Sequence, residues 1–213
     1  MTLLGGAAVS LVLAGCGSGY QYFSHRDDSG ATAYFKVPSS WTTFDQGQVL
    51  QASNGPLTRD QIKQLENGQW LTSFYGASNA TVNRASDISG PDPSGLTAVR
   101  LLSVSDRDTF SMASLRAAIL GEDPFSPTAE KKYQVLSYDE FTKSGGLRGS
   151  MLVVNVDLGG GTIATVNQVA MVDSGTKYLY LIGVGCRVSC YSINHGVIQQ
   201  VVSSWTVKES PGS

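Results

Sequence analysis

The last third of the chain constrains the fold most, because successive β-rich runs follow one another there with only short turns between them. Gly159-Gly160-Gly161 separates the second run from the third, and Asp173-Ser174-Gly175 separates the third from the fourth. Connections this short join antiparallel neighbours, whereas parallel strands need a crossover of roughly a dozen residues or more. The region therefore predicts an antiparallel meander. Its runs are Tyr133–Phe141, Leu147–Leu158, Thr162–Val172 and Lys177–Gly185.

A helix is expected directly after this meander, because apolar residues recur at helical spacing from residue 193 to residue 205. Shorter helices are predicted at Ser111–Leu120, which Gly121 ends, and after Thr58, whose spacing to Gln61 is that of a capping box. An antiparallel sheet of about six to seven strands covered by such helices is an α+β layer fold. The apolar stripe of the last helix comprises Ile193, Val197, Ile198, Val201, Val202 and Trp205.

The first half of the chain gives shorter and less regular signals. Residues 20–28 mix aromatic and charged side chains without a clear period. Residues 46–56 and 86–95 are expected to be loops. The strands predicted here are Ala31–Val37, Trp41–Phe44, Trp70–Tyr75 and Leu96–Val104.

The N-terminus carries an apolar run, Leu3–Leu13, that is too short to span a bilayer but has the length of a signal-peptide core. The next residues, Leu13-Ala14-Gly15-Cys16, resemble the lipobox of bacterial lipoproteins. That resemblance implies a diacylglyceryl group on the Cys16 thiol and cleavage between Gly15 and Cys16. No Lys or Arg precedes the apolar run, which departs from the usual signal-peptide pattern. The alternative is an apolar N-terminal strand or helix with a buried cysteine.

This interpretation divides the chain into three parts. Residues 1–15 are a lipoprotein signal peptide, residues 16–30 are the lipidated cysteine with a flexible tether, and residues 31–208 are one globular domain. Gly17-Ser18-Gly19 has the composition of a flexible linker. The expected location is the extracytoplasmic face of the cell membrane, held by the lipid on Cys16, since two acyl chains give stable anchoring.

Cys186 and Cys190 stand at the end of the last predicted strand and just before the last helix. Outside the cytoplasm two such cysteines are expected to form a disulfide. The competing interpretation is a metal site made of Cys186, Cys190 and His195. A structural zinc site needs four protein ligands, so this set is incomplete, and we predict no metal.

Composition excludes some functions. The formal net charge is −2 and charged residues make up only 15% of the chain, so no basic field attracts nucleic acid, and membrane attachment must come from lipid. The chain has no Gly-x-Ser-x-Gly, His-Glu-x-x-His or Walker motif, and we predict no catalytic residue and no cofactor. His25, in the tether, and His195, on the polar helix face, are interpreted as surface histidines.

Near pairs of acids are interpreted as solvated loop residues, because nothing selects a pair for glycosidase-like chemistry. They are Asp27 with Asp28, Asp106 with Asp108, and Asp139 with Glu140. The tryptophans Trp41, Trp70 and Trp205 are expected mainly in the core, with a ligand groove as the alternative.

Two stretches resemble PsbP-like domains. Phe35-Lys36-Val37-Pro38-Ser39-Ser40-Trp41 is similar to their opening strand, and Val201-Val202-Ser203-Ser204-Trp205-Thr206-Val207, after Lys177-Tyr178-Leu179-Tyr180-Leu181, to their closing segment. The resemblance implies an α/β/α sandwich with a central antiparallel sheet, and an accessory or partner-binding role. It carries over no catalytic residue.

Three functions are therefore weighed. The first is a membrane-anchored accessory or binding module with an envelope protein as partner. The second is a carrier of a small apolar ligand or lipid, held between the sheet and the last helix. The third is an enzyme acting on envelope components through carboxylates that the sequence does not identify.

Overall fold

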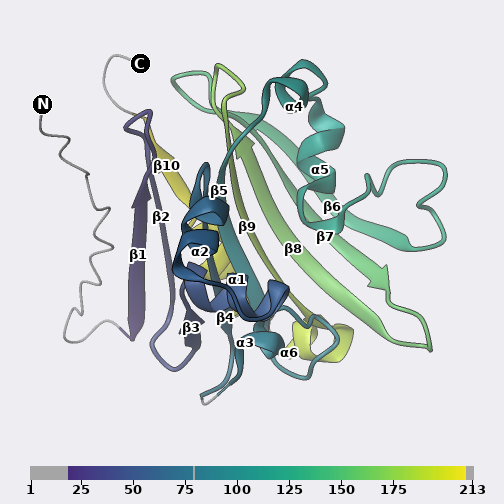
Figure 1. Ribbon diagram of the computed structural model, residues 1–213. Helices are drawn as coiled ribbons and strands as arrows, with labels where there is room; N and C mark the ends of the chain where they lie inside the picture. The colour runs from purple at the N-terminus through teal and green to yellow at the C-terminus, as the bar shows by residue number, and fades with distance from the viewer. Residues whose placement is uncertain (1–18, 79, 210–213) are drawn as a thin grey trace, which may run out of the picture.

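A seven-stranded antiparallel sheet forms the centre of the protein (Figure 1), in a computed structural model that describes residues 19–78 and 80–209. The four predicted runs of the last third form its β6–β9 half, each paired with the next, so the predicted meander is confirmed. In spatial order the strands are β3 (Thr42–Phe44), β4 (Gln69–Tyr75), β5 (Ser94–Leu101), β9 (Tyr178–Arg187), β8 (Ile163–Val172), β7 (Arg148–Asp157) and β6 (Tyr133–Thr142).

Helices cover both faces of this sheet. α5 (Met112–Leu120) and α6 (Val188–Ser203) lie on opposite faces, as two neighbouring residues of β8 show. Asn167 Nδ2 donates to Gln199 Oε1 of α6 at 3.2 Å, whereas Gln168 Nε2 donates to the Leu115 carbonyl of α5 at 2.7 Å. Because adjacent strand residues point to opposite faces, these contacts place one helix on each side. The predicted α+β class is confirmed.

A second sheet, which the sequence did not predict, contains β1 (Tyr20–Arg26), β2 (Thr32–Pro38) and β10 (Thr206–Lys208). β1 lies in the stretch expected to be tether, yet it pairs with β2 along its whole length. Most of its side chains are half-buried on both faces. The strand therefore lacks the alternation of apolar and polar residues that marks a strand with one buried face. That explains why residues 20–26 looked irregular.

The small sheet packs on the α6 side of the large one through aromatic side chains. Phe35 of β2 contacts Phe74 of β4 and Trp205, with ring centroids 6.0 Å apart in both pairs. Trp41 contacts Phe74 at 5.9 Å. Trp41 and Trp205 are only 6% and 3% exposed, so two of the tryptophans belong to the core, as expected.

α6 begins five residues earlier than predicted, directly after β9, and the earlier start adds residues to the buried face. Cys190 and Tyr191 of its first turns enter the core with Ile198, Val201 and Val202. At 100° per residue, Ile193 lies roughly 120° from the centre of that face. Ile193 is 85% exposed, so its assignment to the buried stripe was wrong.

The remaining helices are short. The expected loop at 46–56 is wrong, because α1 (Gln46–Asn54) forms there behind a capping box made by Asp45 and Gln48. Only two of its residues are buried, which explains the weak apolar pattern. The predicted capping box of Thr58 and Gln61 is confirmed. The others are α2 (Arg59–Glu66), α3 (Val82–Ala85) and α4 (Val104–Asp108). The strand predicted at 96–104 ends at Leu101, and its last predicted residue, Val104, begins α4.

The predicted leader and Cys16 lie outside the described residues, so cleavage and lipid attachment stay predictions. In the part that the structure describes, no helix is both long and apolar enough to cross a bilayer.

Candidate binding cleft

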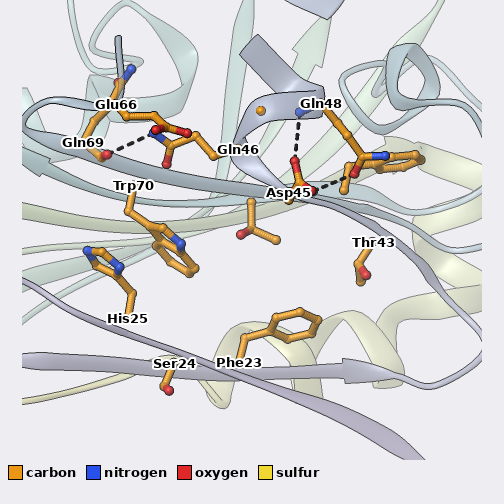
Figure 2. A pocket seen from close by; sticks show the side chains of 13 residues that line it. Phe23, Ser24, His25, Thr43, Asp45, Gln46, Gln48, Glu66, Gln69 and Trp70 are labelled. Carbon is orange, nitrogen blue, oxygen red and sulfur yellow. Dashed lines mark hydrogen bonds between the residues drawn. The ribbon is translucent and has the colours of Figure 1, made fainter. Parts of the chain in front are cut away.

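A cleft of about 690 Å³ opens where β1 of the small sheet runs past the β4 end of the large sheet (Figure 2). It exists because β3 pairs only with Ser73, Phe74 and Tyr75, the last residues of β4. After β3 the chain turns into α1 instead of continuing the sheet. The first half of β4 therefore has no β3 partner, and the cleft opens between it, β1 and the start of α1.

Aromatic rings form one wall of the cleft. The imidazole of His25 stacks on the indole of Trp70, with centroids 4.8 Å apart and planes at 6°. Phe23, two residues before His25, stacks on Phe35 at 4.8 Å, and Phe35 in turn contacts Trp70 at 6.2 Å. Figure 2 shows the rings of His25 and Trp70 next to each other, with Phe23 on the same strand as His25. The wall is thus tied into the core between the two sheets.

The opposite side is built by the start of α1. The Gln46 side chain replaces the missing part of β3, because its Nε2 donates to the Gln69 carbonyl at 3.2 Å and its Oε1 accepts from the Leu71 amide at 2.8 Å. An amide side chain can pair with a strand edge in this way because it offers the same donor and acceptor as a peptide group. Asp45 Oδ1 accepts from the Gln48 amide at 2.9 Å and fixes the first turn.

The charges of the cleft are acidic or neutral. Asp45 and Glu66 line it, and none of its described lining residues is Lys or Arg. Burial lowers the pKa of His25 below its usual 6.5, although the carboxylates of Asp27 and Asp28 oppose part of that shift. The imidazole is therefore neutral at pH 7.

Acid is expected to destabilise the protein through His25. Because folding lowers the His25 pKa, the unfolded state binds the extra proton first as the pH falls through 6.5, and the free energy of unfolding declines until the pH passes the folded-state value. Above that window the group contributes nothing to the pH dependence. Denaturant unfolding at pH 7.5 and pH 5 should show a larger loss for the wild type than for His25→Gln. Equal losses would contradict the assigned direction.

The sequence predicted part of this site wrongly. His25 was expected on the surface of a tether, but it is half-buried because β1 packs over β4. Trp70 is the tryptophan that fits the groove alternative. Phe23 and Gln46 were missed. The only signal for Gln46 was the Asp45–Gln48 capping spacing, which marks a helix start but not a cleft.

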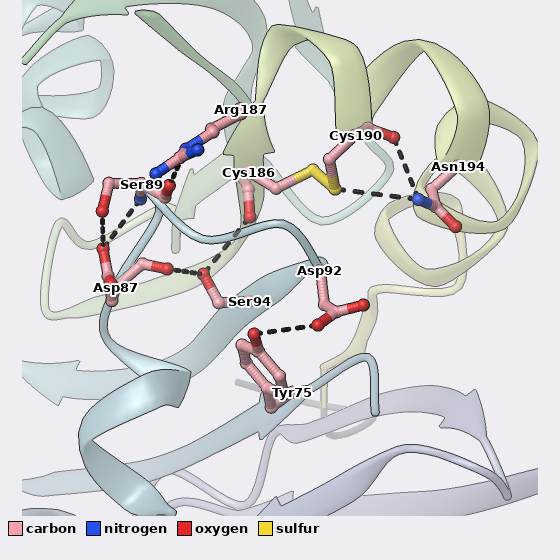
Figure 3. The surroundings of a disulfide bond; sticks show 10 residues. Tyr75, Asp87, Ser89, Asp92, Ser94, Cys186, Arg187, Cys190 and Asn194 are labelled. Carbon is pink, nitrogen blue, oxygen red and sulfur yellow. Dashed lines mark hydrogen bonds between the residues drawn. A yellow bond between two sulfur atoms is a disulfide. The ribbon is translucent and has the colours of Figure 1, made fainter. Parts of the chain in front are cut away.

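Cys186 and Cys190 form the predicted disulfide, with Cα atoms 5.9 Å apart (Figure 3). The bond joins the end of β9 to the first turns of α6. Both sulfurs are thereby bonded to each other, which removes the metal site with His195. Among the described residues no group of His, Cys, Asp and Glu side chains is arranged to hold a metal ion.

The loop beside the disulfide is tied to the same strand end. Ser94 Oγ donates to the carbonyls of Asp87 and Gly185 at 3.1 and 3.2 Å, and the Arg187 side chain donates to the Ser89 carbonyl. Figure 3 shows these contacts next to the disulfide. The disulfide and these hydrogen bonds together hold the ends of β5 and β9 and the start of α6 in place.

One predicted solvated acid is buried. Asp27 is 9% exposed, and its Oδ2 accepts a hydrogen bond from the Tyr180 hydroxyl of β9 at 2.6 Å. Its Oδ1 accepts from the amides of Ser29 and Ala31 at 2.9 and 3.2 Å. Its neighbour Asp28 is exposed. The pair is therefore split between a structural and a surface role.

No protein-family model matches the sequence, and no curated protein sequence matches it. Among solved structures, the chain is similar to LpqN of Mycobacterium tuberculosis, a protein involved in cell envelope biogenesis, at 13% identity and a TM-score of 0.46 over 90% of this chain and 92% of that one. It is similar to PsbP of Synechocystis sp. PCC 6803 at 13% identity and a TM-score of 0.47, over 92% of this chain and 99% of that one. The Ran-binding protein Mog1p of Saccharomyces cerevisiae gives 12% identity and a TM-score of 0.41, over 86% and 93%. None of these similarities assigns a role to a residue of this chain.

Proposed function

We propose that this protein is a lipid-anchored accessory module on the extracytoplasmic face of the cell membrane, and that it binds its ligand or partner in the cleft between β1 and α1. The cleft carries the proposal. Its volume lies within the roughly 300–1,000 Å³ of typical ligand sites, and it combines an aromatic wall with a few placed polar groups. The anchor is the diacylglyceryl group expected on Cys16.

The packing under α6 argues against the alternative function, a carrier that holds a small apolar ligand or lipid between the sheet and this helix. Ile198 and Val201 are fully buried there, together with Ile182 of β9. Side chains buried in this way fill the space around them between helix and sheet, where the sequence had suggested a ligand site. A space that a ligand can enter is the cleft, and it is lined by amides and carboxylates as well as by rings.

The carboxylates favour a binding role over hydrolysis. In the cleft, Asp45 is committed to the N-terminus of α1 through its bond to the Gln48 amide. A general acid or nucleophile needs a carboxyl group placed for proton transfer or attack, with a partner carboxyl across the scissile bond. Asp27, the acid that is most buried, faces Tyr180 in the core instead.

Crosslinking in cells that produce the full chain tests the binding role of the cleft. A photoreactive benzoylphenylalanine replaces Gln48 at the cleft rim or, as control, Arg107 on α4, since both side chains are exposed. We expect an adduct in the membrane fraction from position 48 only, and its loss when Trp70→Ala is added. Equal adducts from both positions, or an adduct that ignores Trp70→Ala, would contradict a role for the cleft.

The anchor is tested separately by Cys16→Ser. This variant should leave the membrane fraction, and the wild-type N-terminal peptide should carry the mass of a diacylglyceryl group on its first residue. A variant that stays in the membrane, together with an unmodified leader in the wild type, would overturn the lipoprotein assignment.

A further inference from the structure

We infer that the cleft binds a neutral saccharide. This inference rests on the proposed function, because it names the ligand class of the same cleft. Three properties of the cleft carry it together: a fixed aromatic wall, carboxylates and carboxamides that can accept or share hydroxyl protons, and the absence of Lys and Arg among its described lining residues.

The aromatic wall suits a ring with an apolar face. His25 and Trp70 stack face to face, so each ring covers one face of the other and a ligand meets the part of the stack that is open to the cleft. Trp70 contacts Phe35, which in turn stacks on Phe23, so the wall is formed before a ligand arrives. Preformed rings lose little conformational freedom on binding. A pyranose ring presents a face of C–H groups that can pack on such a surface, while its hydroxyls point outward toward polar groups.

The polar groups suit a ligand that donates hydrogen bonds. Asp45 uses Oδ1 for the helix cap, and within the described residues its Oδ2 has no hydrogen bond. Glu66, at the exposed end of α2, is an acceptor on the same cleft. Carboxylates are acceptors only, so they pair with hydroxyl or N–H donors. A purely apolar ligand would bury them and the amide groups without partners, at a cost in binding free energy.

Charge separates the saccharide from other ligands with rings. An anionic ligand would meet Asp45 and Glu66 with no facing cation among the described lining residues. A cationic ligand is the stronger competitor, because ammonium groups also bind aromatic faces. However, the charge of Asp45 lies at the N-terminus of α1, where the helix dipole already offsets it, so Glu66 is the carboxylate that a cation would have to find. A neutral polyhydroxy ligand satisfies the wall and the acceptors without needing that charge.

Calorimetric titration of the full-length protein tests the inference, with the protein held in lipid nanodiscs free of glycolipid and of glucoside or maltoside detergents. The probes are chitotriose, maltotriose and cellotriose. We expect at least one to bind saturably, and Trp70→Ala and Glu66→Gln each to weaken that binding by about tenfold. Tyr22→Ala is the matched control, since it removes an exposed ring from the same strand outside the cleft, and it should keep wild-type affinity.

Fluorescence gives an independent readout. Trp41 and Trp205 are buried in the core, so a change on saccharide binding reports Trp70, and Trp70→Phe should abolish it. Tighter binding of the de-N-acetylated, cationic chitotriose than of chitotriose itself would overturn the neutral assignment.

The two proposals fail differently. If none of the three saccharides binds while the Trp70-dependent crosslink from position 48 persists, the saccharide inference is wrong and the binding module stands. If the crosslink is absent while a saccharide binds with the expected dependence on Trp70 and Glu66, the ligand class stands and the cellular role is wrong.

Discussion

Replacing Gly95 by alanine is expected to destabilise the fold by roughly 2–3 kcal/mol, because the new Cβ has no space. Gly95 of β5 lies opposite Phe74 of β4, and the Phe74 ring covers it. A Cβ built on Gly95 would stand 2.4 Å from Phe74 Cε2 and 2.5 Å from the Gly183 carbonyl oxygen of β9. The carbonyl is backbone of a central strand, so it cannot turn away.

The Phe74 ring cannot relieve the clash by changing rotamer. It is fully buried and lies against Phe35 and Trp41 at 6.0 and 5.9 Å. Moving it would disturb the contact that joins the two sheets. The small sheet should therefore loosen first, and the cleft with it.

Denaturant unfolding measures the effect, and Gly196→Ala is the matched control. Gly196 lies on the exposed side of α6, where a Cβ would meet no atom within 4 Å. Alanine in a helix interior is favoured over glycine, so this variant should gain about 0.5–1 kcal/mol. A Gly95→Ala protein as stable as the wild type would show that β4 and β5 can separate locally at no cost.

The sequence predicts the fold best where a segment has a single hydrophobic pattern, either that of a buried strand or that of a helix with one apolar face. β7, β8 and β9 are long, apolar and joined by short turns, so their order and direction follow from the sequence alone. α5 has one apolar face and a Gly121 stop in the left-handed conformation, and its predicted end is confirmed. In these segments local preference and tertiary packing agree.

The cleft was not predictable for a physical reason. Its residues lie on β1, on the first turn of α1 and at the start of β4, and each of these segments is half-buried rather than one-sided. Half-buried segments show no clear period, so residues 20–26 and 46–54 looked like tether and loop. What brings His25 to Trp70 is the packing of one sheet on another, which no spacing along the chain records. The burial of Asp27 has the same origin.

The second large effect is expected at the contact between Asp27 and Tyr180, which joins the β1–β2 turn to the central strand β9. Asp27 Oδ2 accepts from the Tyr180 hydroxyl, and Oδ1 accepts from the amides of Ser29 and Ala31 and from the Ser29 hydroxyl. The Tyr180 side chain is 1% exposed, and burial together with the bond to Asp27 raises its pKa well above the usual 10. The Asp27 carboxylate and the Tyr180 hydroxyl can bind water instead of each other only if the two sheets move apart.

Asp27→Ala should therefore cost about 3 kcal/mol in the free energy of unfolding, because it takes the acceptor from the buried Tyr180 hydroxyl and from the Ser29 amide. The Ala31 amide keeps only its longer bond to the Ser29 hydroxyl, at 3.4 Å. Tyr180→Phe removes one donor to a charged group and should cost about 1.5–3 kcal/mol. Because the two side chains act on each other, the double variant should be more stable than the sum of the single losses predicts. Asp28→Ala, the exposed neighbour, should change stability by less than about 0.5 kcal/mol. Additive losses would mean that the turn holds its place without Tyr180, and the small sheet would then depend on aromatic contacts such as those of Phe35 with Phe74 and of His25 with Trp70.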